Sequence, residues 1–66
     1  MEIKLNGETI NIAPKTTLLE LLEQYKIETK SIVVAINLES IKKEQWDNYI
    51  IQENDVIECL TFLGGG

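Results

Sequence analysis

The run of β-prone residues near the end of the chain, residues 56–63, places the strongest limit on the fold. Its Val, Ile, Thr and Phe residues favour a strand, and it is the last structured segment in a chain of 66 residues. A chain of this length has room for one small hydrophobic core. The last strand must therefore join a sheet that the earlier residues have already started.

The first twelve residues predict a β-hairpin. Apolar and polar residues alternate over residues 2–6, as in a strand with one buried face. Asn6-Gly7 follows, and it is a strong hairpin signal because both central residues of a type I′ turn need φ above zero. We expect residues 8–12 to pair back antiparallel, with Ile10 and Ile12 facing the core.

One helix is expected next. Thr17 and Glu20 have the spacing of a capping box. From Leu18 onward, three leucines and Tyr25 recur at i, i+3, i+4 and i+7, which gives one apolar stripe. The stripe should lie on the sheet, and the charge of Lys26 suits the last turn of the helix.

The middle of the chain predicts one interior strand and an irregular segment. Residues 31–36 are apolar and rich in β-branched side chains, which is typical of a buried strand. Residues 37–40 turn the chain. Residues 41–51 are irregular, with a short helical turn that places Trp46 at the edge of the core. A direct contact of Trp46 with a partner is the less favoured alternative.

The element order is strand, strand, helix, strand, irregular segment, strand. The rules for crossover connections allow the first and last strands to lie side by side and parallel in the sheet centre. The sequence therefore predicts an α+β fold of the β-grasp, ubiquitin-like class: a mixed sheet of four to five strands with one main helix across one face. Residues 1–63 form this domain, and residues 64–66 form a flexible glycine tail.

Composition limits the possible functions. Six lysines against eleven carboxylates give a net charge of −5, and there is no Arg. This argues against nucleic acids and anionic membranes as ligands and favours a basic protein partner. The chain has no His, one Cys, no phosphate-binding loop and no spaced metal ligands. We expect a cytoplasmic protein that is not an enzyme and that binds no cofactor itself.

The terminal glycines offer one reactive group. A glycine backbone is slim enough for a narrow channel, and the α-carboxylate at its tip, with a pKa of about 3.3 to 3.7, is ionised at neutral pH. A frayed chain end is the alternative interpretation.

Five segments carry a resemblance to a known family, at residues 21–23, 34–37, 44–46, 53–55 and 62–66. Together they resemble the sulfur-carrier branch of the ubiquitin-like proteins, and within it the ThiS family of thiamin biosynthesis. Gln45-Trp46 favours that family within the branch. Lys42-Lys43 stands where many relatives have Pro-Arg. Asn54 stands where Gly is common, and the turn is still expected because Asn tolerates left-handed geometry.

The resemblance implies a protein cosubstrate. An E1-like, ThiF-like adenylyltransferase would use ATP to adenylate the Gly66 carboxylate. Sulfur from a cysteine-derived persulfide would then give a thiocarboxylate, and a ThiG-like thiazole synthase would take that sulfur. Gly65 is needed because a Cβ near the tip would crowd both enzyme channels. The alternatives are a molybdopterin-synthase small subunit, a tRNA-thiolation carrier and a ubiquitin-like modifier that forms isopeptides.

Alternation along the last strand predicts its two faces. Cys59 shares the helix-facing side with Ile57, so a core role is favoured over a persulfide role. Leu60 and Phe62 share the opposite side with Glu58. We therefore expect Leu60 and Phe62 to form a docking surface, which Leu63 and Gly64 continue into the tail. Val33 or Ala35 extends it, depending on the parity of the interior strand.

Overall fold

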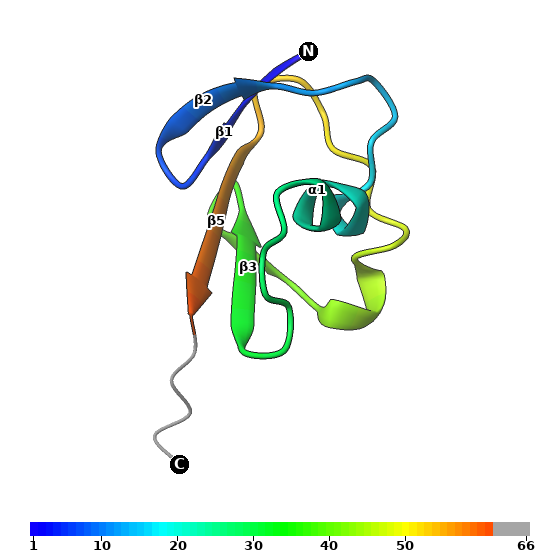
Figure 1. Cartoon of the computed structure of the whole chain (residues 1–66). Helices are drawn as coiled ribbons and strands as arrows, with labels where there is room; N and C mark the ends of the chain where they lie inside the picture. Colours follow the sequence, from blue (N-terminus) through cyan, green and yellow to red (C-terminus); the bar gives the residue numbers. More distant parts are fainter. Residues whose placement is uncertain (62–66) are drawn as a thin grey trace.

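The chain forms a mixed sheet with one helix packed across one face (Figure 1). The structure is a computed structural model, and it describes residues 1–61. Its elements are β1 (Glu2–Leu5), β2 (Glu8–Asn11), α1 (Leu18–Gln24), β3 (Ile32–Ile36), β4 (Glu39–Ile41), the 3-10 turn η1 (Lys43–Gln45) and β5 (Val56–Thr61).

The strands lie in the order β2-β1-β5-β3-β4. The first and last strands, β1 and β5, pair in parallel at the centre of the sheet. The other neighbouring strands pair antiparallel. The predicted β-grasp architecture is confirmed. The predicted boundary between a domain of residues 1–63 and a tail of residues 64–66 lies outside the described residues.

The first hairpin has the predicted turn. Asn6 has a φ of 50° and Gly7 a φ of 83°, as a type I′ turn requires. Ile3 pairs with Ile10 across the hairpin, and both pack in or against the core. Ile12 is also buried, although β2 ends one residue before it.

The helix begins as predicted and ends earlier than predicted. The Thr17 hydroxyl accepts a hydrogen bond from the Glu20 N–H (3.2 Å), and the Glu20 carboxylate accepts one from the Thr17 N–H (2.9 Å). At the other end Lys26 has a φ of 54°, and the Lys26 and Ile27 N–H groups turn back to the carbonyls of Glu23 and Leu22. This is a Schellman termination, with Lys26 where Gly is usual.

Two predictions about this end were therefore wrong. Tyr25 follows the last helical residue and is 45% exposed, so it does not continue the buried stripe. Lys26 lies beyond the helix and contributes no charge to its last turn. The three leucines of the stripe are fully buried.

A second hairpin forms where residues 37–40 were predicted to turn the chain, and its strand β4 also takes in Ile41, the first residue of the predicted irregular segment. Asn37 and Leu38 both have positive φ, 53° and 70°, and β4 then pairs back with β3. The turn has the type I′ pattern without glycine, so it lacks the signal that marks the first hairpin. The sheet therefore has five strands.

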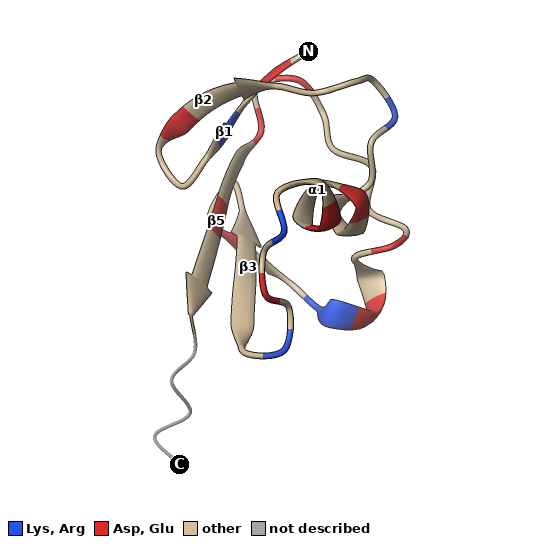
Figure 2. Ribbon diagram, in the orientation of Figure 1, with Lys and Arg blue, Asp and Glu red and all other residues tan. Residues whose placement is uncertain are grey.

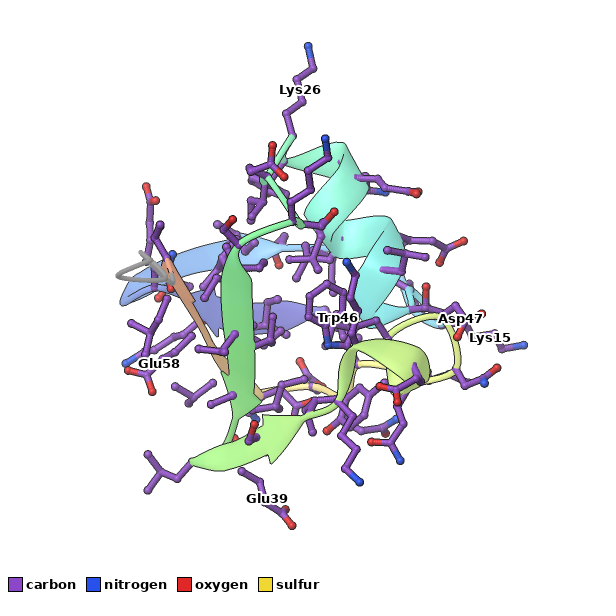
Figure 3. The ribbon with its side chains drawn as sticks, turned by 90° about the horizontal axis from the view of Figure 1, so that it is seen from below. Lys15, Lys26, Glu39, Trp46, Asp47 and Glu58 are labelled. Carbon is purple, nitrogen blue, oxygen red and sulfur yellow. The ribbon has the colours of Figure 1, made fainter. Side chains whose placement is uncertain are left out.

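The core lies between the sheet and the helix. The short helical turn predicted before Trp46 is present as η1. Trp46 is 2% exposed, and its Nε1–H donates to the Ile41 carbonyl at 3.0 Å. Its position within the protein, beside the helix and η1, can be followed in Figure 3. Trp46 therefore belongs to the core, and a backbone carbonyl satisfies its indole N–H.

Candidate functional site

The candidate site is the last strand and the residues that follow it. β5 lies between β1 and β3 and leads directly into residues 62–66 (Figure 1). Phe62, Leu63, Gly64, Gly65 and Gly66, the predicted reactive and docking residues of this segment, lie outside the described residues. The structure describes the strand that carries them.

The two faces of β5 are those that alternation predicts. Ile57 is fully buried against the core. Glu58 is exposed, and Leu60 is 59% exposed on the face turned away from α1. Leu60 is therefore placed as predicted for a docking residue.

The interior strand adds to this exposed face. Val33 pairs with Leu60 across the β3–β5 ladder, and Ala35 pairs with Glu58. Paired residues share a face, which fixes the parity that the sequence left open. Val33 is 48% exposed, and Val56, in phase with Leu60 on β5, is 40% exposed. We call Val33, Ala35, Val56 and Leu60 the open-face patch.

Charge surrounds this patch unevenly. Glu58 lies on β5 between the patch residues, and Lys4 pairs with Val56 from the neighbouring β1. Figure 2 shows that most of the remaining lysines lie in loops and turns away from β5. Lys42 and Lys43 are both exposed.

Two asparagine side chains hold β5, one at its first residue and one at its fourth. The Val56 N–H donates to Asn37 Oδ1 at 3.0 Å, and the Cys59 N–H donates to Asn6 Oδ1 at 2.7 Å. Each asparagine is the first central residue of a type I′ turn, so the same residue shapes a hairpin and satisfies a strand donor. Sequence reasoning predicted the Asn6 turn but missed both hydrogen bonds to β5. The Asn6 contact spans 53 positions, and no local pattern marks it.

A buried carboxylate closes the turn before β5. Asp55 is 6% exposed. One of its oxygens accepts from Asn37 Nδ2 at 3.0 Å, and the other accepts from the Gln52 N–H at 2.9 Å. Asn54 beside it has a φ of 70°, so Asn holds the left-handed position as expected. These contacts fix where β5 begins.

Cys59 is half-buried and packs against the core. Burial raises the pKa of its thiol above the usual value. Because the thiolate is the reactive form, the thiol at neutral pH is a weaker nucleophile than a free cysteine. This supports the packing role that alternation predicted.

Residues 1–61 contain no group of three or more His, Cys, Asp or Glu side chains placed to hold a metal ion. Over the same residues, no helix is both long enough and apolar enough to cross a membrane.

The chain is similar to known proteins in both sequence and fold. The sequence model of the ThiS family matches residues 3–66. The Sulfur carrier protein ThiS of Bacillus subtilis is 37% identical over 65 residues, which cover 97% of this chain and 98% of the relative. The crystal structure of a thiamine biosynthesis protein (ThiS) from Geobacter metallireducens superimposes with a TM-score of 0.89 at 29% identity, over the whole of both chains.

A further relative is much longer. A protein of Paramagnetospirillum magneticum named Thiazole synthase is 29% identical over 66 residues, which are 100% of this chain and 20% of that protein. The whole chain thus corresponds to about a fifth of that relative.

Proposed function

The chain belongs to the ThiS family, the sulfur carriers of thiamin biosynthesis, and from that premise we propose that its Gly66 carboxylate carries the sulfur. One observation supports this choice above the others. β5 lies between β1 and β3 in the sheet and ends at Thr61, and the three terminal glycines begin three residues later at Gly64. The rival sulfur site, the Cys59 thiol, is half-buried and has a raised pKa.

The Gly66 carboxylate must be activated before sulfur can be attached to it. A carboxylate repels nucleophiles, so an E1-like enzyme first attaches AMP from ATP to the Gly66 carboxylate and releases pyrophosphate. The terminal sulfur of a protein persulfide then attacks the carbonyl carbon, and AMP leaves. A thiol cleaves the resulting acyl disulfide to give the thiocarboxylate. The chain is thus a cosubstrate, and the partner enzyme supplies the ATP site.

Thiazole synthase is the proposed acceptor of the sulfur. The similarity between the whole chain and a fifth of a thiazole synthase supports this partner, because it indicates that such a carrier domain and a synthase can share one polypeptide. The net charge of −5 favours a basic surface on the enzymes that hold the carrier. We place these reactions in the cytoplasm.

The open-face patch is the proposed docking surface. Exposed Val33 and Leu60 lie side by side at the end of the sheet nearest the tail. An enzyme must hold the body of the carrier while it threads the glycines, and an apolar patch beside the tail serves that purpose. Phe62, Leu63 and Gly64 are the proposed continuation of this contact.

Intact mass measurement tests the proposal. After incubation with ATP, an E1-like enzyme and a persulfide donor, the chain should show one oxygen replaced by sulfur, and fragmentation should place the change at Gly66. A variant that lacks Gly65 and Gly66 should remain unmodified. If that variant were thiolated as much as the wild type, the proposal would be wrong and another group of the chain would carry the sulfur.

A further inference from the structure

The last part of β5 has a strand on one side only. Among residues 1–61, β1 pairs with β5 through Lys4–Val56 and Leu5–Ile57 and no further, whereas the pairing with β3 continues to Thr61. Figure 1 shows that β5 runs on past the β1–β2 hairpin. We call the side of residues 59–61 that has no neighbouring strand the β5 edge.

The hydrogen bonds show which backbone groups face this edge. The Ile57 carbonyl accepts from the Asn6 N–H at 2.8 Å, and the Cys59 N–H donates to Asn6 Oδ1 at 2.7 Å. The backbone groups of alternate residues in a strand point to the same side. The next groups on that side are therefore the Cys59 carbonyl and the Thr61 N–H. They have the spacing that one added strand requires.

The outer edges of the sheet are better protected. β4 has only three residues, and the first of them is the charged Glu39. β2 has four residues and carries Glu8. Proteins commonly block free edges with short strands, charges, Pro or bulges. The β5 edge is Cys-Leu-Thr, which has neither charge nor Pro.

We propose that the β5 edge receives an extended segment of the thiazole synthase, which adds to the sheet as a strand. This rests on the proposed function, since the occupant is the enzyme that must hold the tail. Backbone pairing gives such a strand its affinity. Glu58 beside the edge and the net charge of −5 favour a neutral or basic segment. They oppose a second copy of this chain, which would bring like charges together.

The position of the edge explains what pairing would achieve. Gly66 is the fifth residue after Thr61, and five extended residues reach about 18 Å at most. A strand fixed at Thr61 therefore limits where the terminal carboxylate can lie in the synthase. The patch holds the body of the carrier, and the edge sets the register of the tail.

Thr61→Pro tests the edge directly. Proline removes the Thr61 N–H, and its ring occupies the edge, while no N–H that faces β3 is lost. Affinity for the synthase, measured by titration calorimetry, should fall about tenfold or more. Thr61→Ala keeps the N–H and should stay within about twofold of the wild-type affinity. Amide exchange at Glu58 and Leu60 should remain slow in both variants, which shows that the β3–β5 ladder is intact.

A second measurement needs no variant. Addition of the synthase to the wild-type chain should slow exchange of the Thr61 amide about tenfold or more. An unchanged Thr61 amide in the complex, or equal affinities for Thr61→Pro and wild type, would overturn the proposal. Equal losses in Thr61→Pro and Thr61→Ala would also overturn it, because they would assign the contact to the side chain.

Self-pairing is a separate outcome. A dimer of the wild-type chain in sedimentation, lost in Thr61→Pro, would overturn the proposal in favour of a second copy. The proposed function is judged separately by thiocarboxylate formation on the wild-type chain. If the wild-type chain is thiolated normally but Thr61→Pro binds the synthase as tightly as wild type, the proposed function holds and the proposed edge contact is wrong. If the wild-type chain is not thiolated, the proposed function is wrong whatever the affinities are.

Discussion

The two faces of β5 differ sharply although they belong to one strand. Ile57 is completely buried against α1 and the core, whereas Leu60, three residues later, is 59% exposed. Both are large aliphatic side chains, so hydrophobicity alone does not decide their roles. Position along the alternation decides, and it assigns one side chain to stability and the other to recognition.

The difference shows how a small carrier can combine a firm body with a binding surface. A 66-residue chain has few residues to spare, and it cannot build a separate binding domain. One strand therefore serves both purposes and also delivers the tail. A substitution on the buried face should therefore lower stability, whereas one on the open face should weaken binding.

Ile57→Ala should have the largest effect. Removing a fully buried aliphatic side chain costs about 2 to 5 kcal/mol of unfolding free energy, which is a large part of the stability of a domain this small. Urea unfolding followed by circular dichroism measures it. The fraction that remains folded should still be thiolated at Gly66, because Ile57 does not face the open side.

Leu60→Ala should give the opposite pattern. Leu60 is largely exposed, so its truncation should change the unfolding free energy by less than about 0.5 kcal/mol. Binding to the E1-like enzyme and the synthase should weaken by about 1 to 4 kcal/mol if Leu60 or Phe62 is a central anchor. Phe62→Ala is expected to behave in the same way. A large fall in melting temperature with unchanged binding would reverse the assignment of faces for the residue concerned.

Much of this arrangement followed from local patterns in the sequence. The Asn6-Gly7 turn, the Thr17 capping box and the β-branched run before Asn37 each depend on a few neighbouring residues. Alternation in β5 then gave the burial of Ile57 and the exposure of Leu60, and these predictions are confirmed.

The errors have physical causes of two kinds. β4 was missed because Asn37-Leu38 forms its turn without glycine, and Tyr25 was misplaced because Lys26 takes a left-handed conformation that few non-glycine residues adopt. The parity of Val33 depended on a register with Leu60 that only the sheet defines. The Asn6–Cys59 hydrogen bond joins distant segments, so no local pattern carries it.

Asn6 allows a smaller and sharper test of how β5 is held. Asn6→Gly preserves the positive φ of the turn and removes the acceptor of the Cys59 N–H. We expect a loss of about 0.5 to 1.5 kcal/mol of unfolding free energy and faster exchange of the Cys59 amide.

Asn6→Asp is the matched control for that substitution. It keeps an acceptor oxygen at the same position and tolerates the left-handed turn, so exchange at Cys59 should stay close to wild type. Faster exchange in both variants would mean that the turn, and not the hydrogen bond, protects the amide.

Cys59 gives the smallest expected effect, and it concerns pH. Burial raises the pKa of the thiol in the folded chain above its value in the unfolded chain. At alkaline pH the folded chain therefore keeps a proton that the unfolded chain has lost. Unfolding then releases a proton, so stability should be complete below the unfolded pKa of about 8.5 and should fall as the pH rises above it.

Cys59→Ala removes this titration, so the difference between the wild-type and variant pH profiles gives the contribution of the thiol. Denaturant unfolding measured between about pH 7 and pH 10 should show a steeper alkaline loss of stability in the wild type than in the variant. Tyr49 also has a raised pKa, caused first by burial and then by the charges of Asp55 and Glu39, but it is present in both chains and cancels in the difference. Parallel pH profiles would show that the Cys59 thiol is as well solvated as in the unfolded chain. In that case Cys59 would not belong to the buried face of β5, and the contrast between the two faces would end at Ile57.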